Sequence, residues 1–238
     1  MNQQGVHRSA ILADSAELGE GVAIGPGAVI EETAKIGDGT VIEANAFVGA
    51  GAVVGSRCRI GVGAVVREGV IIDDDVSVGC GAVLGTDGFG YVFDGNTHFK
   101  IPQVGTVHIG AGSIVESGSC IDRATTGVTE VGANSHIGPM VMIGHNCSLG
   151  HDCQVGFQVG LAGSSRMGDN CVLGPQSGMV MRAELGNDCK VEFRGALLRK
   201  FGDGCHVAGY PARPIAEVRR LEAAVRRLPD LLDELGVK

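Results

Sequence analysis

The chain has 238 residues, among them 40 glycines, no tryptophan, seven phenylalanines and two tyrosines, and 44% of the residues are hydrophobic. Many glycines and few rings predict a narrow interior of aliphatic side chains with frequent sharp turns, rather than a wide aromatic core. The formal net charge of −8 argues against a general affinity for nucleic acid or anionic membranes, because both need clustered Lys and Arg, although it leaves room for a local basic patch.

The first residues, MNQQGVHRSAIL, contain no apolar core long enough for a signal peptide. No stretch of the chain approaches the length of apolar sequence that crosses a bilayer. We therefore expect a soluble, cytoplasmic protein without an integral membrane segment.

A six-residue repeat begins at Leu12 and continues to Leu84, with an aliphatic residue at every sixth position. A small or β-branched residue usually follows four positions later, as Ala28 and Ala34 illustrate. Neither a helix nor a simple alternating strand has this period. The repeat predicts an all-β fold in which short strands and turns form the coils of a parallel β-helix.

The repeat breaks after Leu84, resumes at Ile109, and skips again between Ile121 and Val131 before it continues to Leu197. We therefore expect one β-helical domain over residues 1–208, with a long excursion at 85–108 and a shorter one around 126–130. Long excursions from a regular solenoid are commonly functional.

The positions of most cysteines in the repeat predict their role. Five of them occupy the small inward position, namely Cys58, Cys147, Cys153, Cys171 and Cys189. A free cysteine packs as a small hydrophobic residue. We expect core packing rather than disulfides, which a reducing cytosol disfavours, or zinc, for which no CxxC pair is present.

Residues 209–238 change character and predict a C-terminal helical extension. Apolar residues from Ile215 to Leu235 recur at helical spacing. Pro214 suits the start of a helix, whereas Pro229 should kink or divide it.

Three segments carry the most specific motifs: GTDGFGYVFDGNTHFKIPQVG at 85–105, CIDRATTG at 120–127 and MIGHN at 142–146. In this order within a hexapeptide solenoid, they resemble the UDP-3-O-acylglucosamine N-acyltransferase family. The similarity extends from about Val6 to the tail, where VAGYPARPI resembles a segment that closes the coil of many hexapeptide acyltransferases. The resemblance implies a left-handed helix, although right-handed crossovers are the general rule. It also implies a homotrimer with pockets between neighbouring subunits.

The resemblance further implies an N-acyltransferase of lipid A biosynthesis. In that family a 3-hydroxyacyl group passes from the phosphopantetheine thioester of acyl carrier protein to the amine of a UDP-linked glucosamine, without a bound cofactor or metal. The matching general base is His145. Independently of the family, an attacking amine must lose a proton, and imidazole accepts one near neutral pH. His145 lies two positions after Ile143 of the repeat, where the pattern leaves a side chain facing outward.

The family's oxyanion-binding amide corresponds to Gly163, which is 18 residues after His145 and so lies one coil along. His151 is one hexad away from His145 and should face another side. Asp122 and Arg123 either contribute to the site or form a structural ion pair. We expect five further residues to contact substrate: Asn146, Arg182, Asp87, Phe89 and Tyr91.

The sequence departs from the family pattern in three ways. The family's N-terminal domain, which contributes to uridine binding, has no counterpart in the printed sequence. Arg182 replaces a second pocket histidine, and Gly138 replaces an acidic residue seven positions before the base. Arg182 retains the ability to bind a phosphate or carboxylate. These differences leave the identity of the acceptor open.

Several alternatives remain at the level of sequence. In one alternative the protein is still an acyltransferase, but the donor is acyl-CoA and the acceptor is a different amino sugar outside lipid A synthesis. In another class, His145 and His151 belong to a γ-type carbonic anhydrase with zinc held between subunits. A third alternative is a binding platform without catalysis. The arginines of the tail either form a solvated helix face within a trimer or dock an acidic carrier protein.

Overall fold

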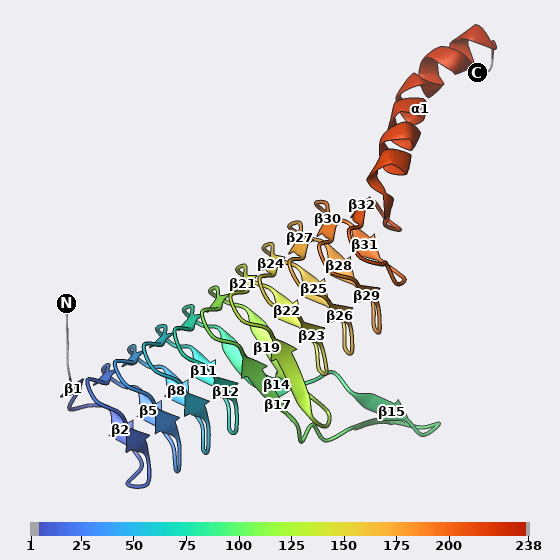
Figure 1. Ribbon diagram of the computed structural model, residues 1–238. Helices are drawn as coiled ribbons and strands as arrows, with labels where there is room; N and C mark the ends of the chain where they lie inside the picture. Colours follow the sequence, from blue (N-terminus) through green and yellow to red (C-terminus); the bar gives the residue numbers. More distant parts are fainter. Residues whose placement is uncertain (1–4, 237–238) are drawn as a thin grey trace.

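The computed structural model describes residues 5–236 and consists of a β-solenoid followed by one helix (Figure 1). The strands form three long sheets that run along the solenoid, plus one two-stranded hairpin. The prediction of an all-β parallel helix with a helical tail is confirmed.

The strand bounds follow the hexapeptide repeat. The twelve-stranded sheet contains β1 (Gly5–Val6), β4 (Ala23–Ile24), β7 (Val41–Ile42), β10 (Arg59–Ile60), β13 (Ser77–Val78), β18 (Ile114–Val115), β21 (His136–Ile137), β24 (Gln154–Val155), β27 (Val172–Leu173), β30 (Lys190–Val191), β32 (His206–Ala208) and β33 (Arg213–Pro214). The ten-stranded sheet contains β2 (Ile11–Leu12), β5 (Val29–Ile30), β8 (Phe47–Val48), β11 (Val65–Val66), β14 (Val83–Asp87), β19 (Cys120–Arg123), β22 (Met142–Ile143), β25 (Gly160–Leu161), β28 (Gly178–Met179) and β31 (Ala196–Leu197). The nine-stranded sheet contains β3 (Glu17–Leu18), β6 (Lys35–Ile36), β9 (Val53–Val54), β12 (Ile71–Ile72), β17 (Thr106–Ile109), β20 (Val128–Val131), β23 (Ser148–Leu149), β26 (Arg166–Met167) and β29 (Glu184–Leu185).

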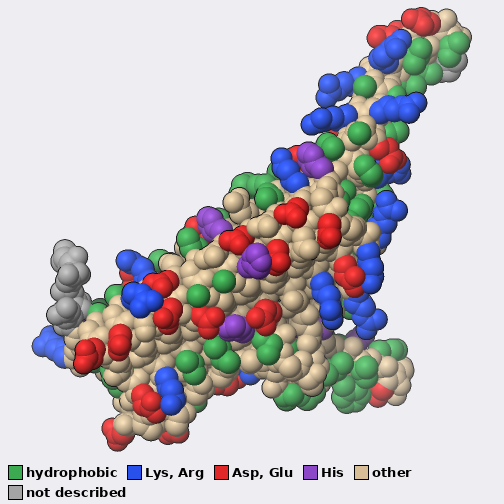
Figure 2. Space-filling view, in the orientation of Figure 1, with side chains coloured by type: hydrophobic (Ala, Val, Ile, Leu, Met, Phe, Trp, Pro, Cys, Tyr) green, Lys and Arg blue, Asp and Glu red, His purple; other side chains and the backbone are tan. Residues whose placement is uncertain are grey.

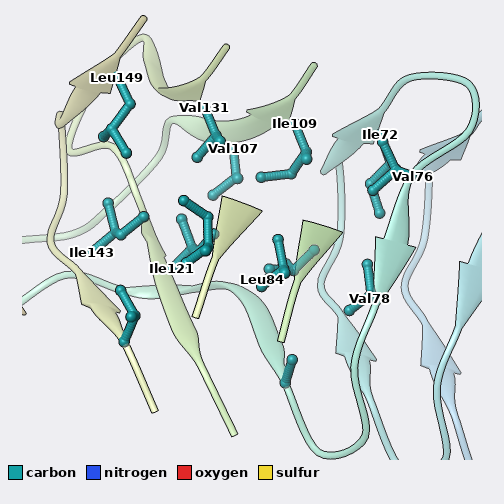
Figure 3. Close-up of a cluster of buried hydrophobic side chains, with 14 of the residues drawn as sticks. Ile72, Val76, Val78, Leu84, Val107, Ile109, Ile121, Val131, Ile143 and Leu149 are labelled. Atoms are coloured by element: carbon teal, nitrogen blue, oxygen red, sulfur yellow. The ribbon is translucent and has the colours of Figure 1, made fainter. Parts of the chain in front are cut away.

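Each regular coil advances the chain by 18 residues, since Val6 pairs with Ile24 and Ile24 pairs with Ile42. Within a two-residue strand, the second residue points into the solenoid and the first points out. Figure 3 shows the resulting interior, where aliphatic side chains such as Leu84, Ile121 and Ile143 stack along the axis. The five cysteines at inward positions are buried, as predicted. The hexad pattern therefore determines which side chains form the core.

The turns between strands depend on one residue with a left-handed backbone. Glycine fills this position in some coils, and in others it is taken by residues such as Asn134 (φ 54°) and Asn146 (φ 58°). Asparagine tolerates this conformation better than most side chains do. Asn146 is thus a turn residue as well as the neighbour of His145.

The excursions leave the solenoid along one edge, which we call the loop edge: the turns that join the ten-stranded sheet to the nine-stranded sheet. β14 extends to Asp87 and β17 begins at Thr106, so the long loop comprises residues 88–105. It projects as a hairpin of β15 (Tyr91–Phe93) and β16 (His98–Lys100) (Figure 1). The short loop, residues 124–127, joins β19 to β20 along the same edge.

Helix α1 (Ile215–Glu234) extends away from the far end of the solenoid (Figure 1). Pro214 precedes it, as predicted, but the helix continues through Pro229. The expectation that this proline divides the helix is wrong, since α1 is continuous from Ile215 to Glu234. A kink at Pro229 stays a prediction. None of the residues of α1 is buried. Among residues 5–236, no helix combines the length and the apolar character needed to span a bilayer.

Candidate functional site

The loop edge gathers residues that are far apart in sequence. His145 lies in the turn after β22, and Gly163 lies in the turn after β25, one coil further along. The base of the long loop and residues 124–127 reach the same place. The candidate site is therefore built from adjacent turns of the scaffold and closed by two excursions.

Gly163 lies directly against the His145 ring. A Cβ atom on Gly163 would be 2.5 Å from Nε2 and 2.8 Å from Cε1 of His145. Contacts this short do not occur between real Cβ atoms and neighbouring heavy atoms, so only glycine fits without a shift. The absence of a side chain here lets the Nε2 side of the imidazole approach the backbone of the next coil.

The N–H of Gly163 has no hydrogen-bond acceptor among residues 5–236. In turns that join the nine-stranded to the twelve-stranded sheet, a carboxylate accepts the N–H at this position, as Asp38 does for Glu20 and Asp74 does for Ser56, each at 2.8 Å. On the loop edge itself, Glu31 accepts the Ala50 N–H at 3.1 Å. No such carboxylate reaches Gly163. A backbone donor is thus left available beside Nε2 of His145.

The opposite side of the His145 ring faces hydrogen-bonding partners. Nδ1 lies 3.2 Å from Oδ1 of Asn146 and 3.4 Å from Oγ1 of Thr125. Asn146 is itself held, since its Oδ1 accepts the Thr125 N–H and its Nδ2 donates to the Thr126 carbonyl, both at 2.9 Å. The orientation of the imidazole is therefore fixed by the short loop.

Asp122 is a buried carboxyl group beside this histidine. It is 3% exposed, and no donor among residues 5–236 hydrogen-bonds to its carboxylate. It follows Ile121, which pairs with Ile143 of the next coil, so it lies next to the turn that carries His145. Burial raises the pKa of Asp122 to about 6, an effect that nearby His145 opposes and Asp87 reinforces.

The alternative of an ion pair between Asp122 and Arg123 is wrong. Neighbouring residues of a strand point to opposite sides. The guanidinium of Arg123 instead contacts the Glu68 carboxylate at 2.9 Å and donates to the Gly85 carbonyl at 2.7 Å. Arg123 thus fastens the start of the long loop, and Asp122 has no Lys or Arg partner in the part of the chain that the structure describes.

The loop residues expected to contact substrate lie farther out. Phe89 is 85% exposed, and its ring packs on Tyr91 with 5.2 Å between centroids. Asp87 forms an ion pair with Lys100 of the hairpin, and this hydrogen bond lowers the Asp87 pKa. Within one chain, the loop aromatics therefore pack on each other rather than on His145.

Arg182 lies two coils beyond His145 on the loop edge, with an exposed side chain. Its backbone N–H donates to the Gly163 carbonyl at 3.2 Å, which continues the stack of turns. The guanidinium makes no hydrogen bond with residues 5–236. Arg182 therefore lies on the same edge as His145, with its side chain exposed.

His151 lies on a different edge, in the turn between the nine-stranded and twelve-stranded sheets. Its ring nitrogens contact Asp152 at 2.6 Å and Asp169 at 3.1 Å. Within residues 5–236, no three His, Cys, Asp or Glu side chains are grouped as metal ligands would be. The two histidines that prompted the zinc alternative are thus not brought together within one chain.

Sequence reasoning missed three residues that touch the site: Gly88 and Gln103 of the long loop, and Thr125 of the short loop. A Cβ atom on Gly88 would lie 2.6 Å from Cβ of His145. Gln103 is 7% exposed and its Oε1 accepts the Thr125 hydroxyl at 3.0 Å. The sequence signal for Gln103 was its position as a polar residue shortly before β17 begins at Thr106, where the loop returns to the scaffold.

Comparisons with known proteins support the fold. Sequence profiles described as "Bacterial transferase hexapeptide (six repeats)" and "Hexapeptide repeat of succinyl-transferase" match residues 15–50, and residues 51–86 and 166–192, respectively. The UDP-N-acetylglucosamine acyltransferase structure from Arabidopsis is similar with a TM-score of 0.78 and 22% identity, over 90% of this chain and 76% of that chain. The Francisella novicida counterpart has a TM-score of 0.67 and 24% identity, over 88% and 69%. These likenesses assign the left-handed β-helix fold.

Curated relatives are more similar in sequence. The chain is 45% identical to UDP-3-O-acylglucosamine N-acyltransferase 1 of Gloeobacter violaceus over 170 residues, which are 71% of this chain and 49% of that relative. It is 49% identical to the Thermosynechococcus vestitus UDP-3-O-acylglucosamine N-acyltransferase over 151 residues, 63% of this chain and 45% of the relative. The chain spans about half the length of the curated relatives it matches. It is therefore a left-handed hexapeptide-repeat β-helix related, over most of its own length, to the UDP-3-O-acylglucosamine N-acyltransferases.

Proposed function

We propose that the protein is an N-acyltransferase that moves an acyl group, of the 3-hydroxyacyl type, from a carrier thioester to the amine of a nucleotide-linked amino sugar in lipid A biosynthesis. The names of the relatives at 43–49% identity supply the reaction and the acceptor class. The observation that carries the proposal is the free Gly163 N–H beside Nε2 of His145. A base and an oxyanion donor are the two groups that attack on a thioester requires.

The mechanism assigns one step to each group. Nε2 of His145 takes a proton from the acceptor amine as the nitrogen attacks the thioester carbonyl carbon. The Gly163 N–H stabilises the negative oxygen of the tetrahedral intermediate. When that intermediate collapses, the C–S bond breaks and the thiolate leaves with the proton that His145 returns. The products are an amide and the free carrier thiol.

Asp122 fits the charge of the acceptor. An amine reaches the site partly as an ammonium ion, and a buried carboxylate without a cation of its own is a suitable partner for it. Asp87, Phe89, Tyr91, Asn146 and Arg182 are proposed to contact the substrates. For Asn146 the contact is indirect, because its side chain is already bonded to Thr125, Thr126 and His145.

The proposed active form is a homotrimer. The first residue of every strand in the ten-stranded sheet is uncharged: Ile11, Val29, Phe47, Val65, Val83, Cys120, Met142, Gly160, Gly178 and Ala196. In the nine-stranded sheet, this position includes Glu17, Lys35, Arg166 and Glu184. An uncharged face next to the loop edge is suited to subunit packing. Figure 2 shows further exposed hydrophobic side chains on the hairpin and along α1.

The donor is proposed to be acyl carrier protein, with acyl-CoA as the alternative donor. Arg219, Arg220, Arg226 and Arg227 on α1 offer a basic surface for an acidic carrier. Five buried free thiols suit a reducing compartment, which supports a cytoplasmic location.

The test is an assay of thiol release and product mass with UDP-amino sugars and either acyl carrier protein or CoA thioesters. Wild-type protein should form an amide product, and His145→Ala should lower the rate by about 100-fold or more. The matched control is His151→Ala, which removes an exposed histidine from another edge and should retain the wild-type rate. Equal rates for wild type and a folded His145→Ala variant would refute the proposal.

A further inference from the structure

The two excursions meet at the Nδ1 side of His145, and the network there determines which nitrogen carries the proton. Nδ2 of Asn146 donates to the Thr126 carbonyl, so its Oδ1 is the atom that accepts the Thr125 N–H. The same Oδ1 lies 3.2 Å from Nδ1 of His145. An amide oxygen only accepts, and this contact is a hydrogen bond when Nδ1 is protonated.

The second neighbour of Nδ1 is set by the long loop. Nε2 of Gln103 donates to the Ile101 carbonyl at 3.0 Å, which directs Oε1 toward Thr125. The Thr125 hydroxyl has one proton and uses it on this Oε1, at 3.0 Å. Its oxygen then presents lone pairs to Nδ1 of His145, 3.4 Å away. Both neighbours of Nδ1 therefore accept.

Gln103 can act in this way only when the base of the loop is in place. A Cβ atom on Gly88 would lie 2.6 Å from the His145 Cβ and 2.8 Å from Gln103 Oε1, so both ends of the loop close over the ring. Gln103 is 7% exposed, whereas Phe89 and Val104 beside it are 85% and 74% exposed. The buried base of an otherwise exposed loop thus contacts the histidine.

We propose that Gln103 is a positioning residue: through the Thr125 hydroxyl it holds His145 in the Nδ1–H tautomer, which leaves the lone pair on Nε2, the nitrogen that faces Gly163. Without the Gln103 oxygen, the Thr125 hydroxyl can rotate and donate to Nδ1, and the proton then moves to Nε2, where it blocks proton abstraction. Docking of the long loop against His145 is thereby coupled to the ability of His145 to act as a general base. The inference rests on the proposed function for the catalytic role of Nε2.

The experiment measures the tautomer directly by long-range 15N–1H NMR of imidazole-labelled protein, with the His145 signals assigned from their loss in His145→Ala. At a pH where the imidazole is neutral, the wild-type protein should show a protonated Nδ1 and an unprotonated Nε2. Gln103→Met, which keeps the size of the side chain but lacks the amide, should shift the proton toward Nε2. It should lower kcat by about tenfold to a hundredfold, with little change in the KM of the donor.

A second pair of variants separates this role from a general effect on folding. Thr125→Val removes the hydroxyl that would donate to Nδ1, so both Thr125→Val and the double variant Gln103→Met/Thr125→Val should keep the proton on Nδ1, which Asn146 Oδ1 still accepts. Thr125→Ser retains the hydroxyl and should keep the wild-type tautomer and kcat. Gln154→Ala, an exposed glutamine on β24, is the control and should change neither. An unchanged tautomer in Gln103→Met overturns the inference. A tautomer that shifts equally in Gln103→Met and in the double variant, or one that shifts while kcat stays at the wild-type value, overturns it too. If wild type transfers no acyl group, the proposed function fails, while the NMR comparison still tests the tautomer.

Discussion

The backbone of Gly163 and the imidazole of His145 are in direct contact across two adjacent coils, with Nε2 2.5 Å from the position that a Cβ atom on Gly163 would occupy. The solenoid repeat creates this contact, since residues 18 apart stack on one another. The contact places an unoccupied backbone N–H beside the nitrogen that we propose as the base.

The first prediction concerns this contact. Gly163→Ala should lower kcat by about 100-fold or more, because the methyl group displaces either the ring or the oxyanion donor. The control is Gly202→Ala, since a Cβ atom there has no neighbour within 4 Å. Steady-state rates with one acyl thioester measure the effect. A Gly163→Ala enzyme with wild-type kcat would show that the amide is not used.

The second prediction concerns the buried carboxyl group of Asp122. Its folded-state pKa of about 6 lies above the ordinary value of 3.8, so the folded protein holds this proton more tightly than the unfolded chain does. Ionised Asp122 therefore lowers stability above pH 6, and the cost disappears as the pH falls toward 4. Asp122→Asn should raise the free energy of unfolding at pH 7.5, by up to about 3 kcal/mol, and give no gain near pH 4.

Urea denaturation at the two pH values, at fixed protein concentration, measures this difference. Asp230→Asn, on the exposed surface of α1, is the control and should show no comparable gain. If the carboxylate binds the acceptor amine, the more stable Asp122→Asn enzyme should also have a higher KM for the acceptor. A variant that is less stable at both pH values would contradict the prediction.

The third prediction concerns His108, whose ring contacts Asp73 at 3.1 Å and Glu130 at 2.9 Å. Partial burial acts to lower the His108 pKa, but the two carboxylates outweigh it and raise the pKa above 6.5. The stabilisation is complete below the ordinary pKa and is lost as the pH rises through the raised one. His108→Gln should therefore cost roughly 0.5–1 kcal/mol at pH 6 and less at pH 8.5.

Thermal or urea unfolding of His108→Gln and wild type at both pH values tests this. His136→Gln, which removes a more exposed histidine with the single carboxylate neighbour Glu116, serves for comparison and should have a smaller effect at pH 6. A larger loss for His108→Gln at pH 8.5 than at pH 6 would have the wrong sign.

The fourth prediction concerns the two sides of one strand. In β12, Ile72 is 1% exposed and Ile71 is 39% exposed. Ile72→Ala should lower the free energy of unfolding by about 2–5 kcal/mol because it leaves a cavity in a narrow core, whereas Ile71→Ala should cost less than about 1 kcal/mol. Denaturant titration distinguishes the two. Equal losses would mean that the inward and outward positions are wrongly assigned.

The fifth prediction concerns the proposed trimer face. Val65→Lys places a charge on the uncharged outer row of the ten-stranded sheet and should dissociate the trimer, as measured by sedimentation or light scattering. Val53→Lys makes the same change on the nine-stranded sheet and should leave the trimer intact. Trimers that persist in Val65→Lys, or a wild-type protein that is an active monomer, would refute this choice of face.

The scaffold follows directly from the hexapeptide repeat. A period of six with paired apolar positions specifies which side chains point inward, because a strand of two residues has one inner and one outer face. It also placed His145 and Gly163 one coil apart, and it placed His151 on a different side. Inward positions such as Ile143 and Cys147 are therefore buried, as the pattern predicts.

The surroundings of His145, by contrast, depend on how the two loops dock in three dimensions. Gln103 and Thr125 are 42 and 20 residues from His145 in sequence, and both belong to excursions that have no period. Where such a loop docks depends on side-chain contacts and buried hydrogen bonds, and these have no repeating signature in the sequence. For the same reason the partner of Arg123 is Glu68, 55 residues away, rather than the adjacent Asp122. Periodicity fixes the neighbours of residues within the coils, whereas packing alone fixes the neighbours of residues that leave them.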